Sequence, residues 1–151
     1  MPDAGGLLEH TLRFGVRTYE VDENGHVNNA VYLQWAENLT ADHAEAAGFG
    51  RAWSLERGGA WLVRRHEISY RQPAVRGDEI EATVRVLALG GVRGVRRTTF
   101  VRSGDGVAIA DVASEWVWVR LSDGRPMRVP AELMDRYRPV LAAAGPESSG
   151  D

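Results

Sequence analysis

The chain has 151 residues, of which 44% are hydrophobic, and a formal net charge of −3 at pH 7. This size and composition fit one domain with one packed core, and the charge argues against a general nucleic-acid binder. No apolar run reaches the ~18 residues that a membrane span needs. Cysteine is absent and the N-terminus lacks a signal-peptide pattern, so disulfide and thiolate chemistry are excluded and we expect a cytoplasmic location.

The first half of the chain predicts a strand followed by a long helix. Residues 1–10 have no regular pattern and are predicted to form a flexible arm, whereas residues 11–19 alternate apolar and polar side chains as in a strand. Helical spacing begins at about Asn29 and continues to Ala47, and Gly48 is a suitable helix end. One apolar stripe on this helix comprises Tyr32, Trp35, Ala36, Leu39, His43, Ala46 and Ala47. Residues 48–59, rich in glycine, are predicted to form a loop.

The second half predicts four strands joined mainly by tight turns. The predicted strands are 61–70, 79–89, 92–102 and 107–121. A short helix over 130–137 follows, and residues 141–151 are predicted to be a disordered tail. This order of elements indicates an α+β fold, with one antiparallel sheet packed on the long helix in a single domain over residues 11–140.

A cluster of polar residues occupies the junction between the first strand and the helix. It has the sequence Asp22-Glu23-Asn24-Gly25-His26-Val27-Asn28-Asn29. A helix N-terminus offers unpaired N–H groups and the positive end of the helix dipole. Such a site suits a reaction that builds negative charge on oxygen, with the Asp22 carboxylate as base or nucleophile.

These residues resemble a known family. The segment from Tyr19 to Leu33 is similar to the pattern of hotdog-fold acyl-CoA and acyl-acyl carrier protein (ACP) thioesterases of the 4-hydroxybenzoyl-CoA thioesterase-like family. A second block, residues 67–79, supports the likeness, and Glu20 matches a second acid found two residues before the aspartate. The resemblance implies a hotdog fold, in which the sheet wraps around the helix, and a homodimer or homotetramer with sites at subunit interfaces.

The resemblance also implies roles for individual residues. Asp22 matches the catalytic carboxylate, and together with Asn24 and His26 it matches an Asp-x-Asn-x-His array. The backbone N–H near Asn29 matches the group that polarises the thioester carbonyl. The implied activity is hydrolysis of an acyl thioester of coenzyme A or ACP. A thioester is already activated, so we expect no cofactor. The four histidines lack paired ligand spacing, so we expect no metal site.

Structural roles compete with these assignments. Asp22 fits a turn cap, and His26 could brace the loop. Asn28 is a candidate both for substrate binding and for the helix N-cap. Tyr32 is a candidate for substrate binding and for the core, and His43 is expected to be a satisfied core histidine.

All 18 basic residues are arginine. Some could bind the phosphates of the carrier, and Arg65 and Arg71 are the candidates we retain. The wider set on the strands is Arg64, Arg65, Arg71, Arg93, Arg96 and Arg97. The two members of each neighbouring pair, Arg64-Arg65 and Arg96-Arg97, point to opposite faces of a strand, so at most one arginine of each pair can face one ligand.

Other functions remain open at this stage. A hotdog dehydratase or hydratase is one, although neither a His-Phe-Pro segment nor an Asp-x-Asn-Pro-x-His loop occurs. A non-catalytic acyl-CoA-binding hotdog domain is another, because a fold does not fix a function. The fragment Asp22-x-Asn24-Gly25 resembles part of a calcium loop but lacks the closing glutamate.

Overall fold

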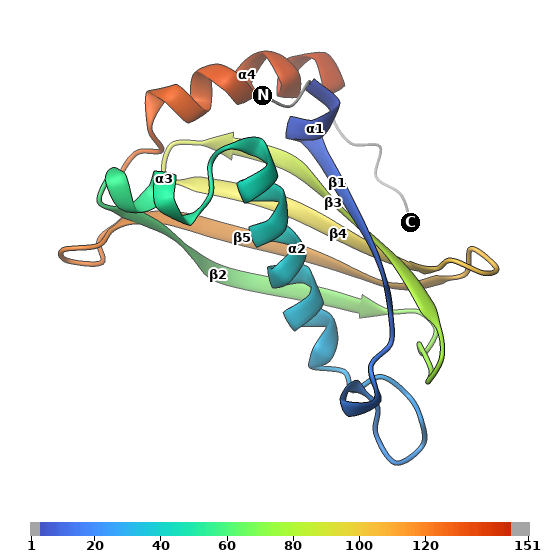
Figure 1. The fold of residues 1–151 in the computed structure, drawn as a ribbon. Helices are drawn as coiled ribbons and strands as arrows, with labels where there is room; N and C mark the ends of the chain where they lie inside the picture. Colours follow the sequence, from blue (N-terminus) through green and yellow to red (C-terminus); the bar gives the residue numbers. More distant parts are fainter. Residues whose placement is uncertain (1–3, 146–151) are drawn as a thin grey trace.

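The computed structural model describes residues 4–145, which form one antiparallel sheet curled around a long helix (Figure 1). The sheet order is β1-β3-β4-β5-β2. The strands are β1 (Glu9–Gly15), β2 (Gly59–Tyr70), β3 (Glu79–Gly90), β4 (Arg93–Arg102) and β5 (Ala108–Arg120). The predicted α+β hotdog architecture is confirmed.

The long helix α2 spans Val31–Ala47 and lies across the concave face of the sheet (Figure 1). Its buried side chains are Val31, Tyr32, Trp35, Ala36, Leu39, His43 and Ala47. This is the predicted stripe with one correction, since Ala46 is exposed. Gly48 ends the helix with a φ of 87°, and the N–H of Phe49 donates to the Ala44 carbonyl. This is the usual left-handed glycine stop.

The sheet is a meander of β3, β4 and β5 with one further strand on each side. β1 pairs with β3, and β2 crosses over to pair with β5, so β1 and β2 are the edges. In β3 the side chains of Ile80, Ala82, Val84 and Val86 are buried while their neighbours are not. That alternation points every second side chain toward α2.

Three other helices differ from the sequence-based expectations. Residues 4–8, part of the predicted flexible arm, form α1 (Ala4–Leu8), because Leu7 is buried in a cluster with side chains of the C-terminal helix. The predicted loop 48–59 contains α3 (Arg51–Glu56). The C-terminal helix α4 spans Ala131–Ala144 and so includes the first residues of the predicted tail. The rest of that tail, from residue 146, lies outside the described residues.

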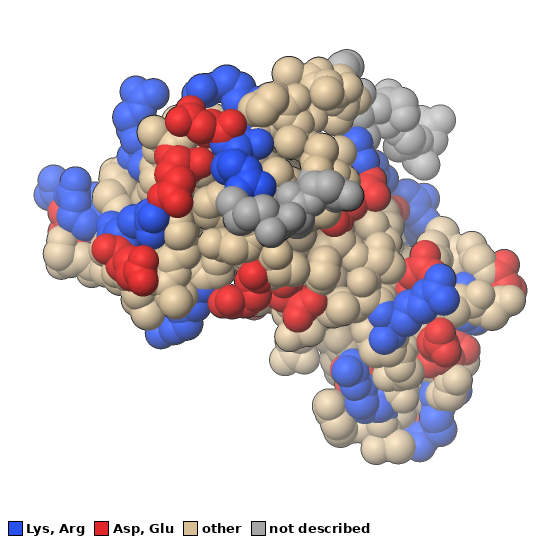
Figure 2. All heavy atoms as spheres, turned by 45° about the horizontal axis from the view of Figure 1, so that its top comes forward, with Lys and Arg blue, Asp and Glu red and all other residues tan. Residues whose placement is uncertain are grey.

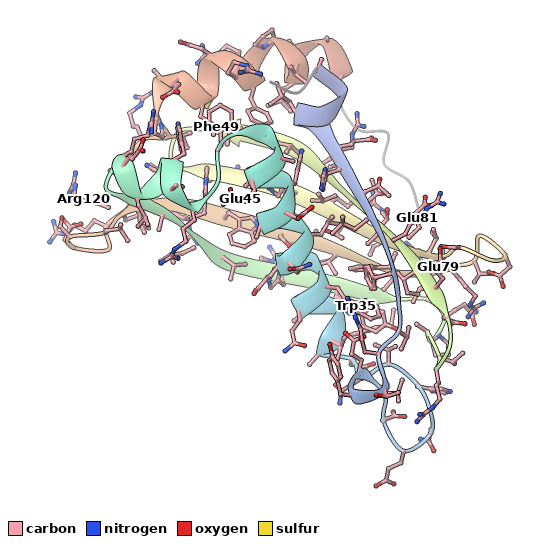
Figure 3. The ribbon with its side chains drawn as sticks, viewed as in Figure 1. Trp35, Glu45, Phe49, Glu79, Glu81 and Arg120 are labelled. Carbon is pink, nitrogen blue, oxygen red and sulfur yellow. The ribbon has the colours of Figure 1, made fainter. Side chains whose placement is uncertain are left out.

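The core divides into two clusters along α2. One surrounds the N-terminal half of the helix and includes Trp35 and Phe100, and the other joins its C-terminal end to α4 and includes Phe49 and Trp118. Figure 3 shows Trp35 near the beginning of α2, and Glu45 and Phe49 near its end. Packing against both halves of the sheet fixes both ends of the helix.

The surface carries charges of both signs. Acidic and basic side chains are interspersed over the face shown in Figure 2. Among residues 4–145, no helix is both long and apolar enough to cross a membrane.

Candidate active site

Residues 20–28 fold back on themselves as a short antiparallel ribbon just before α2, at the lower end of the molecule in Figure 1. The N–H of Asn28 donates to the Glu20 carbonyl at 2.9 Å, and the N–H of Asp22 donates to the His26 carbonyl at 2.8 Å. Asp22 is therefore two residues along the ribbon from the Glu20–Asn28 pair, or roughly 7 Å at the rise of a strand. The predicted motif thus lies beside the N-terminus of α2.

The ribbon is held in place by the segment that precedes β3. The buried Val27 donates its N–H to the Ala74 carbonyl at 2.8 Å, and the N–H of Arg76 donates to the Gly25 carbonyl at 2.9 Å. Gly25 turns the chain with a φ of 75°, a conformation that favours glycine. The turn therefore has a defined position relative to the sheet.

The Asp22 carboxylate is exposed, and its two oxygens differ in their surroundings. Oδ1 accepts hydrogen bonds from the N–H groups of Asn24 and His26, at 2.9 and 3.1 Å. Oδ2 has no hydrogen-bond or ion-pair partner among residues 4–145. One oxygen therefore shapes the turn, as the structural alternative predicted, and the other is available to a substrate or water.

The N–H groups that precede α2 are mostly occupied. That of Asn28 bonds to Glu20, and that of Ala30 bonds to the Asn28 side-chain oxygen at 3.0 Å. The N–H of Asn29 has no acceptor within residues 4–145. The Asn29 carbonyl accepts a hydrogen bond from the Tyr70 hydroxyl at 2.8 Å. Of the N–H groups of residues 28–30, only that of Asn29 therefore lacks an acceptor in the described chain. The N-cap of α2 is Ala30 rather than the predicted Asn28, whose side chain holds the turn before the helix.

Glu20, which matches the family's second acid, is buried and links the ribbon to α2. Its Oε2 accepts a hydrogen bond from the Trp35 indole N–H at 2.7 Å, and its Oε1 accepts one from the N–H of Arg17 at 2.7 Å. Charge-assisted bonds of this kind are among the stronger ones in proteins. Glu20 therefore positions the motif, because both carboxylate oxygens are engaged.

The remaining motif side chains separate into exposed and buried ones. The Asn24 and His26 side chains are exposed and make no hydrogen bond within the described chain. Tyr32, one of the candidates for substrate binding, is only 2% exposed, and its hydroxyl accepts the N–H of Ala74 at 3.2 Å. Burial raises the pKa of this hydroxyl. The structure assigns Tyr32 to the core, as its helical stripe position implied.

Arg65 and Arg71, the two candidate phosphate ligands, lie on the outer face of the sheet. Arg65 neighbours the inward-facing His66 and forms an ion pair with Glu67 at 2.9 Å. Arg71 forms an ion pair with Asp111 at 2.7 Å. Strand alternation directs these side chains away from α2. Within one chain, neither arginine lies on the face that holds the motif, and their binding of phosphate stays a prediction.

One polar network was not singled out by the sequence. His66 of β2 contacts the Ser114 hydroxyl through Nδ1 at 2.7 Å and the Glu37 carboxylate of α2 through Nε2 at 3.1 Å. Nε2–H donates a hydrogen bond to the Glu37 carboxylate, and in a neutral ring Nδ1 then accepts one from the serine hydroxyl. The alternation of side chains along β2 could have indicated that His66 faces inward. Its partners could not be predicted, because Glu37 and Ser114 lie far from it in the sequence. No group of three or more His, Cys, Asp or Glu side chains suited to a metal occurs in residues 4–145.

Comparison with known proteins places the chain in a family. The model of the thioesterase-like superfamily matches residues 16–137. The chain belongs to this superfamily. The predicted family and the predicted enzyme class, a thioesterase, are confirmed.

This thioesterase-like chain is similar to several characterised or solved proteins. The long-chain acyl-CoA thioesterase FadM of Escherichia coli (strain K12) is 29% identical over 126 residues, covering 83% of this chain and 95% of FadM. The acyl-ACP thioesterase ATL3 of Arabidopsis thaliana is 23% identical over 133 residues, covering 87% of this chain and 70% of ATL3. The structure of DHNA-CoA thioesterase from Staphylococcus aureus has a TM-score of 0.82 at 17% identity, with 90% of this chain and 93% of that chain covered, which shows the shared fold.

Proposed function

We propose that this chain hydrolyses acyl thioesters of coenzyme A or ACP to the free acid and the thiol. The observation that carries the proposal is that Asp22 Oδ2 and the N–H of Asn29 both lack partners among residues 4–145, in the segment that leads into the N-terminus of α2. The superfamily membership and the likeness to FadM and ATL3 support it. The absence of cysteine fits a cytoplasmic location.

In the proposed reaction, the thioester carbonyl carbon is attacked by oxygen. Either Asp22 takes a proton from water, whose oxygen then bonds to the acyl carbon, or the carboxylate attacks first and water cleaves the resulting anhydride. The N–H of Asn29 and the positive end of α2 stabilise the oxyanion. In both routes the carbon–sulfur bond breaks when the first tetrahedral intermediate collapses, which in the second route forms the anhydride before water cleaves it, and the leaving thiolate takes up a proton. Asn24 and His26 are exposed beside Asp22 and can contact the thioester.

Asp22 is exposed in one chain, and we propose that a second copy encloses it. The edge strand β2 has 12 residues, and its free edge carries Leu62 and Tyr70, which are 53% and 47% exposed. Long exposed edges of this kind are templates for pairing with another strand. Tyr70 also contacts Asn29, so pairing through β2 would bring the second copy next to the motif. The unit is then a homodimer or homotetramer with the site at the interface.

A substitution on this edge tests the assembly. Leu62→Glu introduces a charge into the proposed interface, and we expect sedimentation equilibrium to show a shift toward monomer together with a loss of thioesterase activity. Ala46→Glu on α2 is the control, since Ala46 is also exposed and belongs to a different element. A fully active monomeric wild-type protein would contradict the interface site.

The Asp22→Asn variant tests the chemistry. An asparagine retains the oxygen that accepts the two turn hydrogen bonds, so the fold is expected to persist, whereas the charge is lost. We expect kcat/KM to fall by at least ~100-fold, as for loss of a general base or nucleophile. The assay is release of free thiol from a panel of acyl-CoA and acyl-ACP substrates. Glu23→Gln, a neighbouring exposed carboxylate in the same turn, should remain close to wild type.

The same panel separates the alternatives. Full activity in Asp22→Asn excludes the proposed mechanism, and loss of activity in Glu37→Gln alone would move the catalytic role to the Glu37–His66 network. Binding of acyl-CoA without thiol release from any substrate would identify a non-catalytic domain. Water addition to enoyl thioesters without hydrolysis would identify a hydratase.

A further inference from the structure

A cavity of about 320 Å³ lies beneath the C-terminal half of α2, apart from the motif. It is enclosed by α2, the sheet, α3 and α4, in the region around the labelled Glu45 and Phe49 in Figure 3. Most of its wall is apolar and includes Phe49, Trp61, Val86, Leu89, Trp116 and Leu133. Such a cavity suits an acyl chain or ring.

Two arginines line this wall, the exposed Arg51 and the more buried Arg96, and the more buried one lacks a carboxylate partner. Arg96 of β4 is partly buried and lines the cavity, and its Nη1 donates to Nδ1 of His43 at 2.8 Å. No carboxylate among residues 4–145 forms an ion pair with it. Of the two acidic residues in the wall, Glu37 is bonded to His66, and Glu45 accepts the N–H of Arg51 at 2.9 Å. Within the described part of the chain, four of the five guanidinium donors of Arg96 therefore have no acceptor.

The histidine that contacts Arg96 does not neutralise it. His43 is fully buried, and its Nε2 lies 2.7 Å from the Gly6 carbonyl, to which it must donate. Nδ1 is then the acceptor for Arg96, which makes His43 neutral. Burial, with the charge of Arg96 as a second cause, lowers the pKa of His43 to about 4. A cation with only a neutral partner in an apolar site is costly unless an anion joins it.

A second polar group lies near this guanidinium. Tyr137 of α4 lines the same cavity, and its hydroxyl has no hydrogen-bond partner within the described chain. Burial raises the pKa of Tyr137, whereas the nearby Arg96 acts to lower it. The hydroxyl is therefore a neutral donor close to the guanidinium.

We propose that the cavity binds an acyl group whose far end carries a carboxylate, held by Arg96 and Tyr137. This inference rests on the proposed thioesterase function. A guanidinium binds a carboxylate through two parallel hydrogen bonds, and the apolar walls accept the intervening methylene groups. Glu37, at the cavity wall, lies six residues along α2 from Val31, or about 9 Å. A thioester at the N-terminus of α2 can thus extend its acyl group along the helix into the cavity.

Kinetics with paired substrates test this specificity. The substrates are a plain acyl-CoA and an ω-carboxyacyl-CoA of the same chain length. We expect the wild-type protein to favour the ω-carboxyacyl substrate in kcat/KM. In Arg96→Met the ratio of the two kcat/KM values, ω-carboxyacyl over plain acyl, should fall by about 10- to 100-fold, the range for hydrogen bonds to a charged group. The control is Arg97→Met, because Arg97 follows Arg96 in β4 but lies near Asp111, at 3.6 Å, on the other face.

Binding measurements separate this inference from the hydrolysis itself. Calorimetry with S-alkyl-CoA and S-(ω-carboxyalkyl)-CoA, which have no thioester to cleave, should show tighter binding of the carboxylated ligand to wild type and to Arg97→Met, but not to Arg96→Met. Equal binding of both ligands to wild type overturns the inference even where plain thioesters are hydrolysed, and that comparison holds even if Arg96→Met does not fold. Preference for a hydroxyl-terminated ligand over the carboxylated one also overturns it. Carboxylate preference without thiol release from any substrate would refute only the hydrolysis.

Discussion

Replacing His43 tests the state of the histidine beneath Arg96. The pKa of His43 is lowered from 6.5 to about 4, chiefly because the ring is buried and secondly because Arg96 is positively charged. The unfolded chain takes up a proton at the ordinary histidine pKa, whereas the folded chain does not until about pH 4. The folded state thus binds fewer protons between these values, and the free energy of unfolding falls as the pH falls through this window.

The magnitude follows from the size of the shift. The difference of 6.5 minus about 4 is about 2.5 pH units, or at most about 3.4 kcal/mol at 1.36 kcal/mol per unit. His10 stacks on His43 and contacts the exposed Asp42, so solvent reaches this side of the cluster and we expect about 2 kcal/mol.

Urea unfolding of wild type and His43→Gln measures this contribution. Between about pH 7 and about pH 4.5, wild type should lose about 2 kcal/mol more than the variant, which has no group to protonate at this position. His26→Gln is the control, because His26 is exposed and its side chain makes no hydrogen bond in the described chain, so its profile should parallel wild type. Equal losses in wild type and His43→Gln would refute the reasoning and with it the neutral state of His43.

Two further substitutions examine the support of the motif and the packing of the sheet. Trp35→Phe removes the indole donor from the buried Glu20 carboxylate, and we expect a loss of about 2–3 kcal/mol in urea unfolding; a loss below about 0.5 kcal/mol would show that the bond is dispensable. Gly59→Ala would place its Cβ 2.2 Å from a ring carbon of Trp118, so we expect a thermal-unfolding loss of about 1–3 kcal/mol, whereas Gly90→Ala, with nothing within 4 Å, should be nearly neutral. Equal effects at the two glycines would contradict the close packing.

Much of the fold could be predicted because its patterns are local. The stripe on α2 repeats every three or four residues, and the strands from residue 59 to residue 120 agree with the predicted ranges to within about two residues. The elements that were missed are short. α1 and α3 contain five and six residues, too few for a periodic pattern, and they are helical because neighbouring elements bury one side of each.

The candidate site also has a part that the sequence predicted and a part that it could not predict. Asp22, Asn24, His26 and Asn29 are adjacent in sequence, and a turn followed by a helix was enough to predict that they lie together. Which N–H stays free was not predictable, because it depends on the bond between Asn28 and Glu20.

The sequence by itself determined the motif, the helix that follows it and the succession of strands along the chain, since each depends on residues a few positions apart. Only the tertiary structure decided that Arg65 and Arg71 face away from the helix while Arg96 faces a cavity beneath it. The reason is that side-chain direction in a sheet follows from register and curvature, and these are set by contacts between residues far apart in the chain.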